Sequence, residues 1–224
     1  ICMTAALPYV ASVIAFCLLA ACGNGDGTVA SPEEGRPAGD KTDLAALDFS
    51  VEEAGQWSSL FRRDSGWFGG DGIFSVSLPA EGGSAPDSAR TMIWFSDTMI
   101  GQVSDGVLQP GYTMVHNSVA LLRGTVPGTA APDFFWKGRG TPRAESLFEP
   151  PGHQSADNGW YWLGDGFVNH AKGDDLYIFA YGVDKTATAA GFGVSKSILI
   201  IIPKGSPPPY DDQRQLETPL FVSG

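Results

Sequence analysis

Two stretches decide the expected fold: GWFGGDGIFSVSLP at residues 66–79 and GWYWLGDGFVNHA at residues 159–171. In both, aromatic residues precede a Gly-Asp-Gly, and a short apolar segment follows it. An Asp between glycines favours a tight turn, and alternating apolar residues after a turn favour a strand. We therefore expect an acidic turn at Asp71 and another at Asp165, each opening an inner strand of a sheet.

The rest of the chain also has the pattern of a turn-rich β protein. It contains 29 Gly and 16 Pro, and few segments have helical periodicity. The segment FSVEEAGQWSSLF, residues 49–61, is compatible with an edge strand or with one turn of helix. Strands are predicted at residues 73–78, 91–95, 118–122, 176–181 and 197–202.

The two Gly-Asp-Gly stretches are imperfect repeats. Each is followed by an inner strand, a loop and an aromatic, apolar strand, which is typical of a β-propeller or a β-solenoid. An irregular β-sandwich is the alternative. Residues 67–224 are long enough for roughly three four-stranded blades of about 45 to 50 residues each. We therefore expect the chain to be part of a longer propeller protein.

The first residues predict an export signal. Residues 1–21 combine an apolar run with small residues, and LAAC, residues 19–22, resembles a bacterial lipobox. An ordinary signal peptide is the alternative. We expect a lipoprotein signal peptide at 1–21, lipidation at Cys22, a flexible tether at 22–42 and a partial propeller domain at 43–224. The expected location is the bacterial cell envelope, on the extracytoplasmic side.

Charge and cysteine content restrict the partners. The net charge of −11 argues against nucleic acid, and membrane contact is expected through the lipid anchor only. All three cysteines lie at or before residue 22, so the body of the chain has no disulfide and no cysteine ligand for zinc. No phosphate-binding loop, dinucleotide fingerprint or nucleophile elbow is present, and we expect no cofactor and no metal.

Five segments, GGDGIFSVSLP, TMIWFSDTMIG, MVHNSVALL, FEPP and WYWLGDGFV, occur in an order that resembles a family of secreted bacterial domains of unknown function. Members of that family are similar to five-bladed β-propeller glycoside hydrolases such as arabinanases and fructan hydrolases. The resemblance covers residues 67 to about 205. It implies an all-β, five-bladed propeller with a central funnel and acidic groups at Asp71, Asp97 and Asp165. It also implies carbohydrate as the partner, in the form of an extracellular poly- or oligosaccharide.

Glycoside hydrolysis requires two carboxyl groups, one protonated and one ionised, on either side of the bond to be cleaved. Asp71 and Asp165 are the candidate catalytic residues, because adjacent glycines let substrate or water approach. The alternative is that each Asp only caps its own turn.

Five further residues are candidates for substrate binding. A strand-end turn is the alternative for Asp97, and a hydrogen-bonded core or surface position is the alternative for His116, which stands beside Asn117. Trp160 and Trp162 would share one face of a strand, where flat rings can stack on sugars or pack between blades. The function stays open between a glycoside hydrolase, a non-catalytic glycan-binding lipoprotein and a structural propeller lipoprotein.

Overall fold

The computed structural model describes residues 50–79, 89–124, 127, 131–152 and 159–220. The expected signal peptide, the tether, Cys22 and the first residues of the expected domain lie outside these ranges. One compact unit spans Glu53–Gly224, and the description below concerns this unit. Within the described ranges, no helix has both the length and the apolar character needed to cross a membrane.

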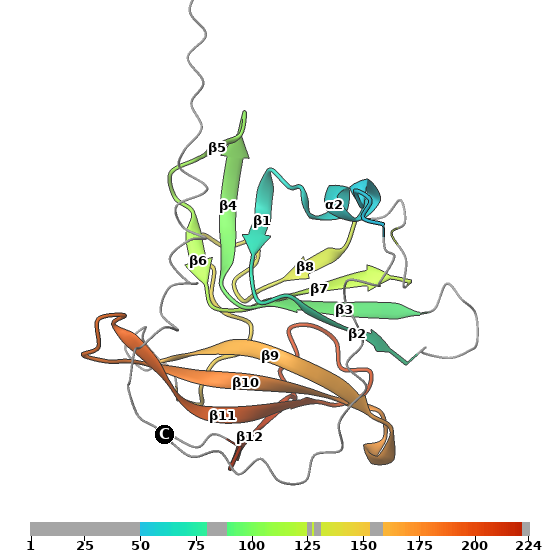
Figure 1. Ribbon diagram of the computed structural model, residues 1–224, viewed down its shortest axis with the longest axis vertical. Helices are drawn as coiled ribbons and strands as arrows, with labels where there is room; N and C mark the ends of the chain where they lie inside the picture. The colour runs from blue at the N-terminus through green and yellow to red at the C-terminus, as the bar shows by residue number, and fades with distance from the viewer. Residues whose placement is uncertain (1–49, 80–88, 125–126, 128–130, 153–158, 221–224) are drawn as a thin grey trace, which may run out of the picture. The chain divides into compact units, whose positions relative to one another are not determined.

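The described residues form three antiparallel sheets of four strands each (Figure 1). In the first sheet, the central strand is β4, and each of the other three strands pairs with it. This sheet consists of β1 (Ser65–Gly70), β4 (Thr98–Ser104), β5 (Val107–Leu108) and β6 (Thr113–Val115). A short helix, α2 (Gly55–Phe61), precedes it and resolves the ambiguity of residues 49–61 in favour of a helix.

The other two sheets contain every strand predicted from the sequence. The second sheet has the order β2 (Phe74–Leu78), β3 (Arg90–Phe95), β7 (Ser118–Arg123) and β8 (Asp133–Phe135). The third is a meander of β9 (Trp160–Asn169), β10 (Asp175–Lys185), β11 (Phe192–Ile202) and β12 (Arg214–Thr218). The all-β class expected from the sequence is therefore confirmed.

The two Gly-Asp-Gly segments differ in structure. Gly70 ends β1, and Gly72 lies in a turn with φ +55, where a Cβ would approach the side chain of Ser96 to 2.7 Å. The second segment lies inside β9, so the prediction of a turn at Asp165 was wrong. At Gly166, a Cβ would lie 2.6 Å from the carbonyl oxygen of Tyr177 and 3.0 Å from the Trp94 ring. This glycine therefore serves close packing within the sheet rather than a turn.

The largest core cluster joins the second and third sheets. The buried side chains Trp94, Tyr161, Ile178 and Ile200 belong to it, and each is at most 1% exposed. The indole Nε1 of Trp94 donates a 2.7 Å hydrogen bond to the carbonyl oxygen of Gly164, so the polar atom of this buried ring has a backbone partner on β9.

A second cluster lies under the first sheet and helix α2. The rings of Trp67 and Phe134 stack with their centroids 4.5 Å apart, and Phe61 contacts both of them edge-on. Burial of these rings explains why the short helix holds its place, since it has no side-chain cap.

Candidate functional site

The turn between β3 and β4 lies against β9. The Oγ of Ser96 donates to the carbonyl oxygen of Leu163 (3.1 Å) and accepts from its N–H (3.0 Å). Ser96 is 6% exposed, so these two hydrogen bonds are shielded from water. They satisfy the backbone N–H and carbonyl oxygen of Leu163, as a neighbouring strand would. The next residue in the turn, Asp97, is thereby held beside the aromatic residues of β9.

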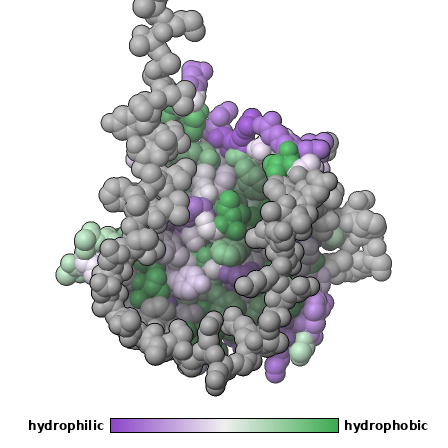
Figure 2. All heavy atoms as spheres, viewed as in Figure 1, coloured by the Kyte–Doolittle hydropathy of each residue, from purple (hydrophilic) through white to green (hydrophobic). Residues whose placement is uncertain are grey.

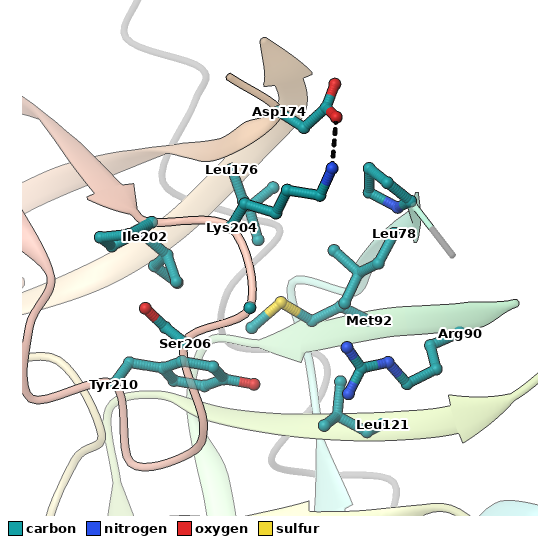
Figure 3. Close-up of a pocket in the computed structure, with 13 residues that line it drawn as sticks. Leu78, Arg90, Met92, Leu121, Asp174, Leu176, Ile202, Lys204, Ser206 and Tyr210 are labelled. Atoms are coloured by element: carbon teal, nitrogen blue, oxygen red, sulfur yellow. Dashed lines mark hydrogen bonds and ion pairs between the residues drawn. The ribbon is translucent and has the colours of Figure 1, made fainter. Parts of the chain in front are cut away.

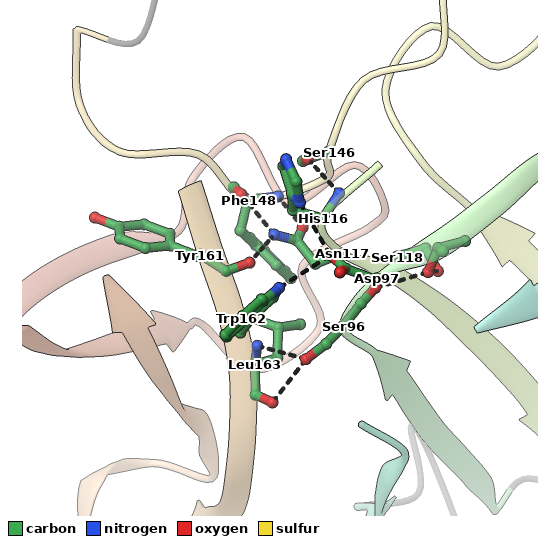
Figure 4. Close-up of polar contacts among 11 residues, drawn as sticks. Ser96, Asp97, His116, Asn117, Ser118, Ser146, Phe148, Tyr161, Trp162 and Leu163 are labelled. Atoms are coloured by element: carbon green, nitrogen blue, oxygen red, sulfur yellow. Dashed lines mark hydrogen bonds and ion pairs between the residues drawn. The ribbon is translucent and has the colours of Figure 1, made fainter. Parts of the chain in front are cut away.

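Asp97 is fixed by two donors that come from different parts of the chain (Figure 4). Its Oδ1 accepts a 2.9 Å hydrogen bond from Nδ1 of His116 and another 2.9 Å bond from Nε1 of Trp162. Because a carboxylate can only accept, Nδ1 of His116 carries the proton and Nε2 is left for another partner. The side chains of His116 and Asp97 are 29% and 27% exposed, so solvent or a ligand can reach both.

The aromatic rings close this arrangement into a cycle of contacts. The imidazole of His116 stacks on Trp160 at a centroid distance of 4.5 Å and an interplanar angle of 18°. Trp160 meets Trp162 edge-on at 6.1 Å, and Trp162 bonds to Asp97. We call these four residues, Asp97, His116, Trp160 and Trp162, the Asp97 cluster. All four were predicted from the sequence as substrate-binding residues, and the structure brings them together.

Phe192 extends the Asp97 cluster and was missed by the sequence analysis. Its ring lies 5.2 Å from that of Trp162 and 6.0 Å from that of Trp160, in both cases edge-on. None of these rings belongs to either core cluster. A single aromatic residue between two glycines, Gly191 and Gly193, gives no sequence signal, and only the pairing of β10 with β11 places it here.

Asp71 lies next to Asp97. Its N–H donates to the carbonyl oxygen of Asp97 (3.1 Å), and its carbonyl oxygen accepts from the N–H of Ser96 (2.9 Å). Partial desolvation of its carboxyl group and then the negative charge of Asp97 raise the pKa of Asp71 above the ordinary value. Hydrogen bonds from the backbone of Asp97 and of Asp71 itself oppose this rise, and the residue stays exposed to solvent.

Asp165, the other expected catalytic residue, lies on the exposed part of β9. Its Oδ1 accepts a 2.8 Å hydrogen bond from the N–H of Gly166. Within the described ranges, it makes no hydrogen bond or ion pair to Asp71 or to the Asp97 cluster. The carboxyl group that adjoins Asp71 is that of Asp97, so a pairing of Asp71 with Asp165 stays a prediction.

Asn117 is buried beneath the site and is hydrogen-bonded to the backbone. It is 0% exposed, and its Nδ2 donates to the carbonyl oxygens of Phe148 (2.9 Å) and Tyr161 (3.0 Å). Its Oδ1 accepts from the N–H of Phe148 at 2.7 Å. The expected contact between Asn117 and substrate is therefore replaced by a structural role, in which it ties the segment after His116 to β9.

A small pocket lies between the second and third sheets, apart from the Asp97 cluster (Figure 3). Its lining includes Met92, Tyr210 and Lys204, whose Nζ is 2.8 Å from the Oδ2 of Asp174. The cavity volume is about 40 Å³, room for roughly three water molecules at about 10 to 15 Å³ each. This space is too small for a sugar ring. The described residues also contain no group of three or more His, Cys, Asp or Glu placed to hold a metal ion.

Comparison with known proteins places the chain in a family. Residues 55–206 match the family described as "Domain of unknown function (DUF5005)", and the chain belongs to this family. No curated protein sequence matches the chain.

A solved structure shares the fold. It is a protein from Bacteroides ovatus ATCC 8483 described as a "putative hydrolase", with a TM-score of 0.54 and 16% sequence identity. The match covers 68% of this chain and 39% of the Bacteroides protein. This chain thus corresponds to well under half of the length of that protein, and the likeness concerns the fold alone.

Proposed function

We propose that the chain is part of a carbohydrate-active protein, a glycoside hydrolase acting on an extracellular poly- or oligosaccharide. The observation that supports this most directly is the Asp97 cluster, where aromatic rings and a carboxylate are joined at the surface next to the carboxyl group of Asp71. Flat rings bury the apolar C–H face of a sugar, while carboxylates and imidazoles accept or donate hydrogen bonds to its hydroxyls.

The chemistry needs one protonated and one ionised carboxyl group. Asp71 suits the acid, because desolvation and the charge of Asp97 both favour its protonated form. Asp97 is the partner carboxyl group in this assignment, because it adjoins Asp71 and two N–H donors hold its Oδ1 in place. Asp165 remains the partner predicted from the sequence, and the two assignments can be separated by mutation.

The test combines a glycan array with a polysaccharide hydrolysis screen, using the wild-type chain and the variants Asp71→Asn, Asp97→Asn and Asp165→Asn. Asn is nearly isosteric but cannot donate a proton as an acid or act as a nucleophile. We expect Asp71→Asn to lower turnover by roughly a hundredfold or more. An equal loss in Asp97→Asn with normal turnover in Asp165→Asn supports the first pairing, and the reverse supports the second. Full turnover in all three variants would exclude both pairings.

A non-catalytic glycan-binding protein is the second candidate. It is favoured by the double use of Oδ1 of Asp97, which holds His116 and Trp162 in place and so gives the carboxylate a structural task. In this case Trp160→Ala and Trp162→Ala weaken glycan binding, whereas Asp71→Asn leaves it unchanged. No hydrolysis of any polysaccharide is then expected from the wild type.

We infer further that the three sheets are blades of a five-bladed propeller and that the mature protein is a lipoprotein of the bacterial envelope anchored through Cys22. The support for the blades is the three four-stranded antiparallel sheets, of which the third is a meander of consecutive strands. The support for the anchor is the LAAC sequence alone. Metabolic labelling with a palmitate analogue tests it: loss of label in Cys22→Ser is expected, and retained label would exclude the anchor. A purely structural propeller lipoprotein predicts no glycan binding at all.

A further inference from the structure

We propose that Phe192 and the turn of residues 186–191 form an outer subsite that binds a second sugar unit, so that the ligand is a chain of sugars rather than a monosaccharide. This inference rests on the proposed function, because it extends the same aromatic surface. The inner unit would lie at the Asp97 cluster and the next unit against the Phe192 ring.

The position of Phe192 supports this assignment. Its ring contacts those of Trp160 and Trp162, and in the described part of the chain no ring pair joins it to the imidazole of His116. The ring therefore extends the aromatic surface of Trp160 and Trp162 onto strand β11. It stays 37% exposed in spite of both contacts, and part of its area is free for a ligand.

The groups beside this ring distinguish it from other exposed apolar residues. Figure 2 shows hydrophobic residues interspersed with polar ones on one face of the protein, and scattered exposed apolar residues are normal. Phe192 differs because it joins a patch that already contains two indoles and an imidazole. Aromatic rings gathered at the surface beside ionisable groups are typical of a ligand site.

The turn next to Phe192 supplies hydroxyl groups in a fixed frame. The N–H of Thr186 donates to the carbonyl oxygen of Gly191 (3.0 Å), and the N–H of Gly191 donates to that of Thr188 (2.9 Å). The Oγ1 of Thr188 lies 2.6 Å from that of Thr186 and donates to the carbonyl oxygen of Phe192 (3.3 Å). Both threonines are exposed, so each hydroxyl can also bond to a sugar hydroxyl.

The experiment measures binding of arabino- and fructo-oligosaccharides, from di- to hexasaccharide, by isothermal titration calorimetry. For the wild type we expect affinity to rise with chain length. Phe192→Ala should lower the affinity for the hexasaccharide by roughly tenfold and leave the affinity for the disaccharide nearly unchanged. Phe192→Leu keeps the apolar bulk without the flat ring, and should show the same loss while protecting the fold.

The matched control is Phe167→Ala. Phe167 is in the same sheet and 44% exposed, but it stacks on Tyr177 and contacts none of the rings at the site. Its substitution should leave the length dependence unchanged. A wild type that binds none of these oligosaccharides and no glycan on the array would overturn the proposed function together with the subsite. A wild type that binds them, with an unchanged length dependence in both Phe192 variants, would overturn the subsite alone.

Discussion

Trp94 and Trp162 are the same residue type with nearly the same hydrogen-bond length, yet their surroundings differ. Trp94 is 0% exposed, and its Nε1 donates to a backbone carbonyl oxygen at 2.7 Å. Trp162 is partly exposed, and its Nε1 donates to the carboxylate of Asp97 at 2.9 Å. The first bond satisfies a polar atom that burial would otherwise leave without a partner. The second orients a charged group that a ligand can reach.

The same contrast runs along β9. Tyr161 and Leu163 point into the core between the second and third sheets, whereas Trp160 and Trp162 point to the other face. Because side chains alternate along a strand, one short segment supplies both the packing and the site. The position of the site therefore depends on the packing of the core on the opposite face of β9. Substitutions on the core face should mainly lower stability, and substitutions on the site face should mainly lower ligand affinity.

The largest effect on stability is expected for Trp94→Ala. Removing this buried ring leaves a cavity and an unpaired carbonyl oxygen at Gly164, and should lower the free energy of unfolding by about 4 kcal/mol. Trp162→Ala should cost about 1 kcal/mol, because the ring is partly exposed already. Urea denaturation of both variants measures the difference, and equal losses would contradict the division between a core face and a site face.

The next largest effect on stability is expected at Asn117, which is buried beneath the site. Asn117→Ala removes the partner of three buried backbone groups, one N–H and two carbonyl oxygens, and should lower the free energy of unfolding by about 3 kcal/mol. The matched control is Asn169→Ala at the end of β9, for which we expect less than about 0.5 kcal/mol. If Asn117→Ala lowers the free energy of unfolding no more than Asn169→Ala does, the hydrogen bonds of Asn117 are not needed for stability.

A smaller effect, on binding rather than on folding, is expected for Trp162→Ala. Loss of the ring and of one donor to Asp97 should weaken glycan affinity by about tenfold or more. Trp57→Ala is the control, because Trp57 is a surface aromatic at 36% exposure on α2 rather than at the site. The comparison is made by calorimetry on the glycans that the array identifies. Equal affinity in Trp162→Ala and the wild type would show that Trp162 has a structural role only.

The smallest effect is the pH dependence of Asp71. Its pKa is raised in the folded state, so its contribution to stability is present below the ordinary value of 3.8 and is lost as the pH rises through the raised value. The difference in unfolding free energy between Asp71→Asn and the wild type should therefore shift in favour of the variant as the pH increases over that range. The shift should be less than about 1 kcal/mol because the residue is exposed. A shift in the opposite direction would mean that the ionised form is favoured.

Local sequence patterns could predict the parts of the fold that depend on neighbouring residues. Alternation and bounding turns located the five predicted strands, and they put Trp160 and Trp162 on one face. The polar strand β12 was missed, because its residues Arg214–Thr218 carry almost no apolar pattern. The second Gly-Asp-Gly was misjudged because the reason for its glycine is the ring of Trp94, far away in the sequence.

The candidate site was predictable by residue type but not by arrangement. Acidic, imidazole and indole side chains could be selected because their chemistry suits sugars. Their contacts join the β3–β4 turn, the β6–β7 turn and strand β9, and such long-range pairs leave no mark in a single sequence. Two further features could not be predicted, because they too depend on long-range contacts. They are the proximity of Asp71 to Asp97 and the position of Phe192.

The most direct test of the account is the indole N–H region of a ¹⁵N-correlated NMR spectrum during titration with glycans. The chain has six Trp, and Trp→Phe variants assign their signals. We expect a bound glycan to shift the signals of Trp160 and Trp162 strongly and to leave that of Trp94 in place. Glycan binding that leaves both Trp160 and Trp162 unmoved would contradict the assignment of the Asp97 cluster as the carbohydrate site.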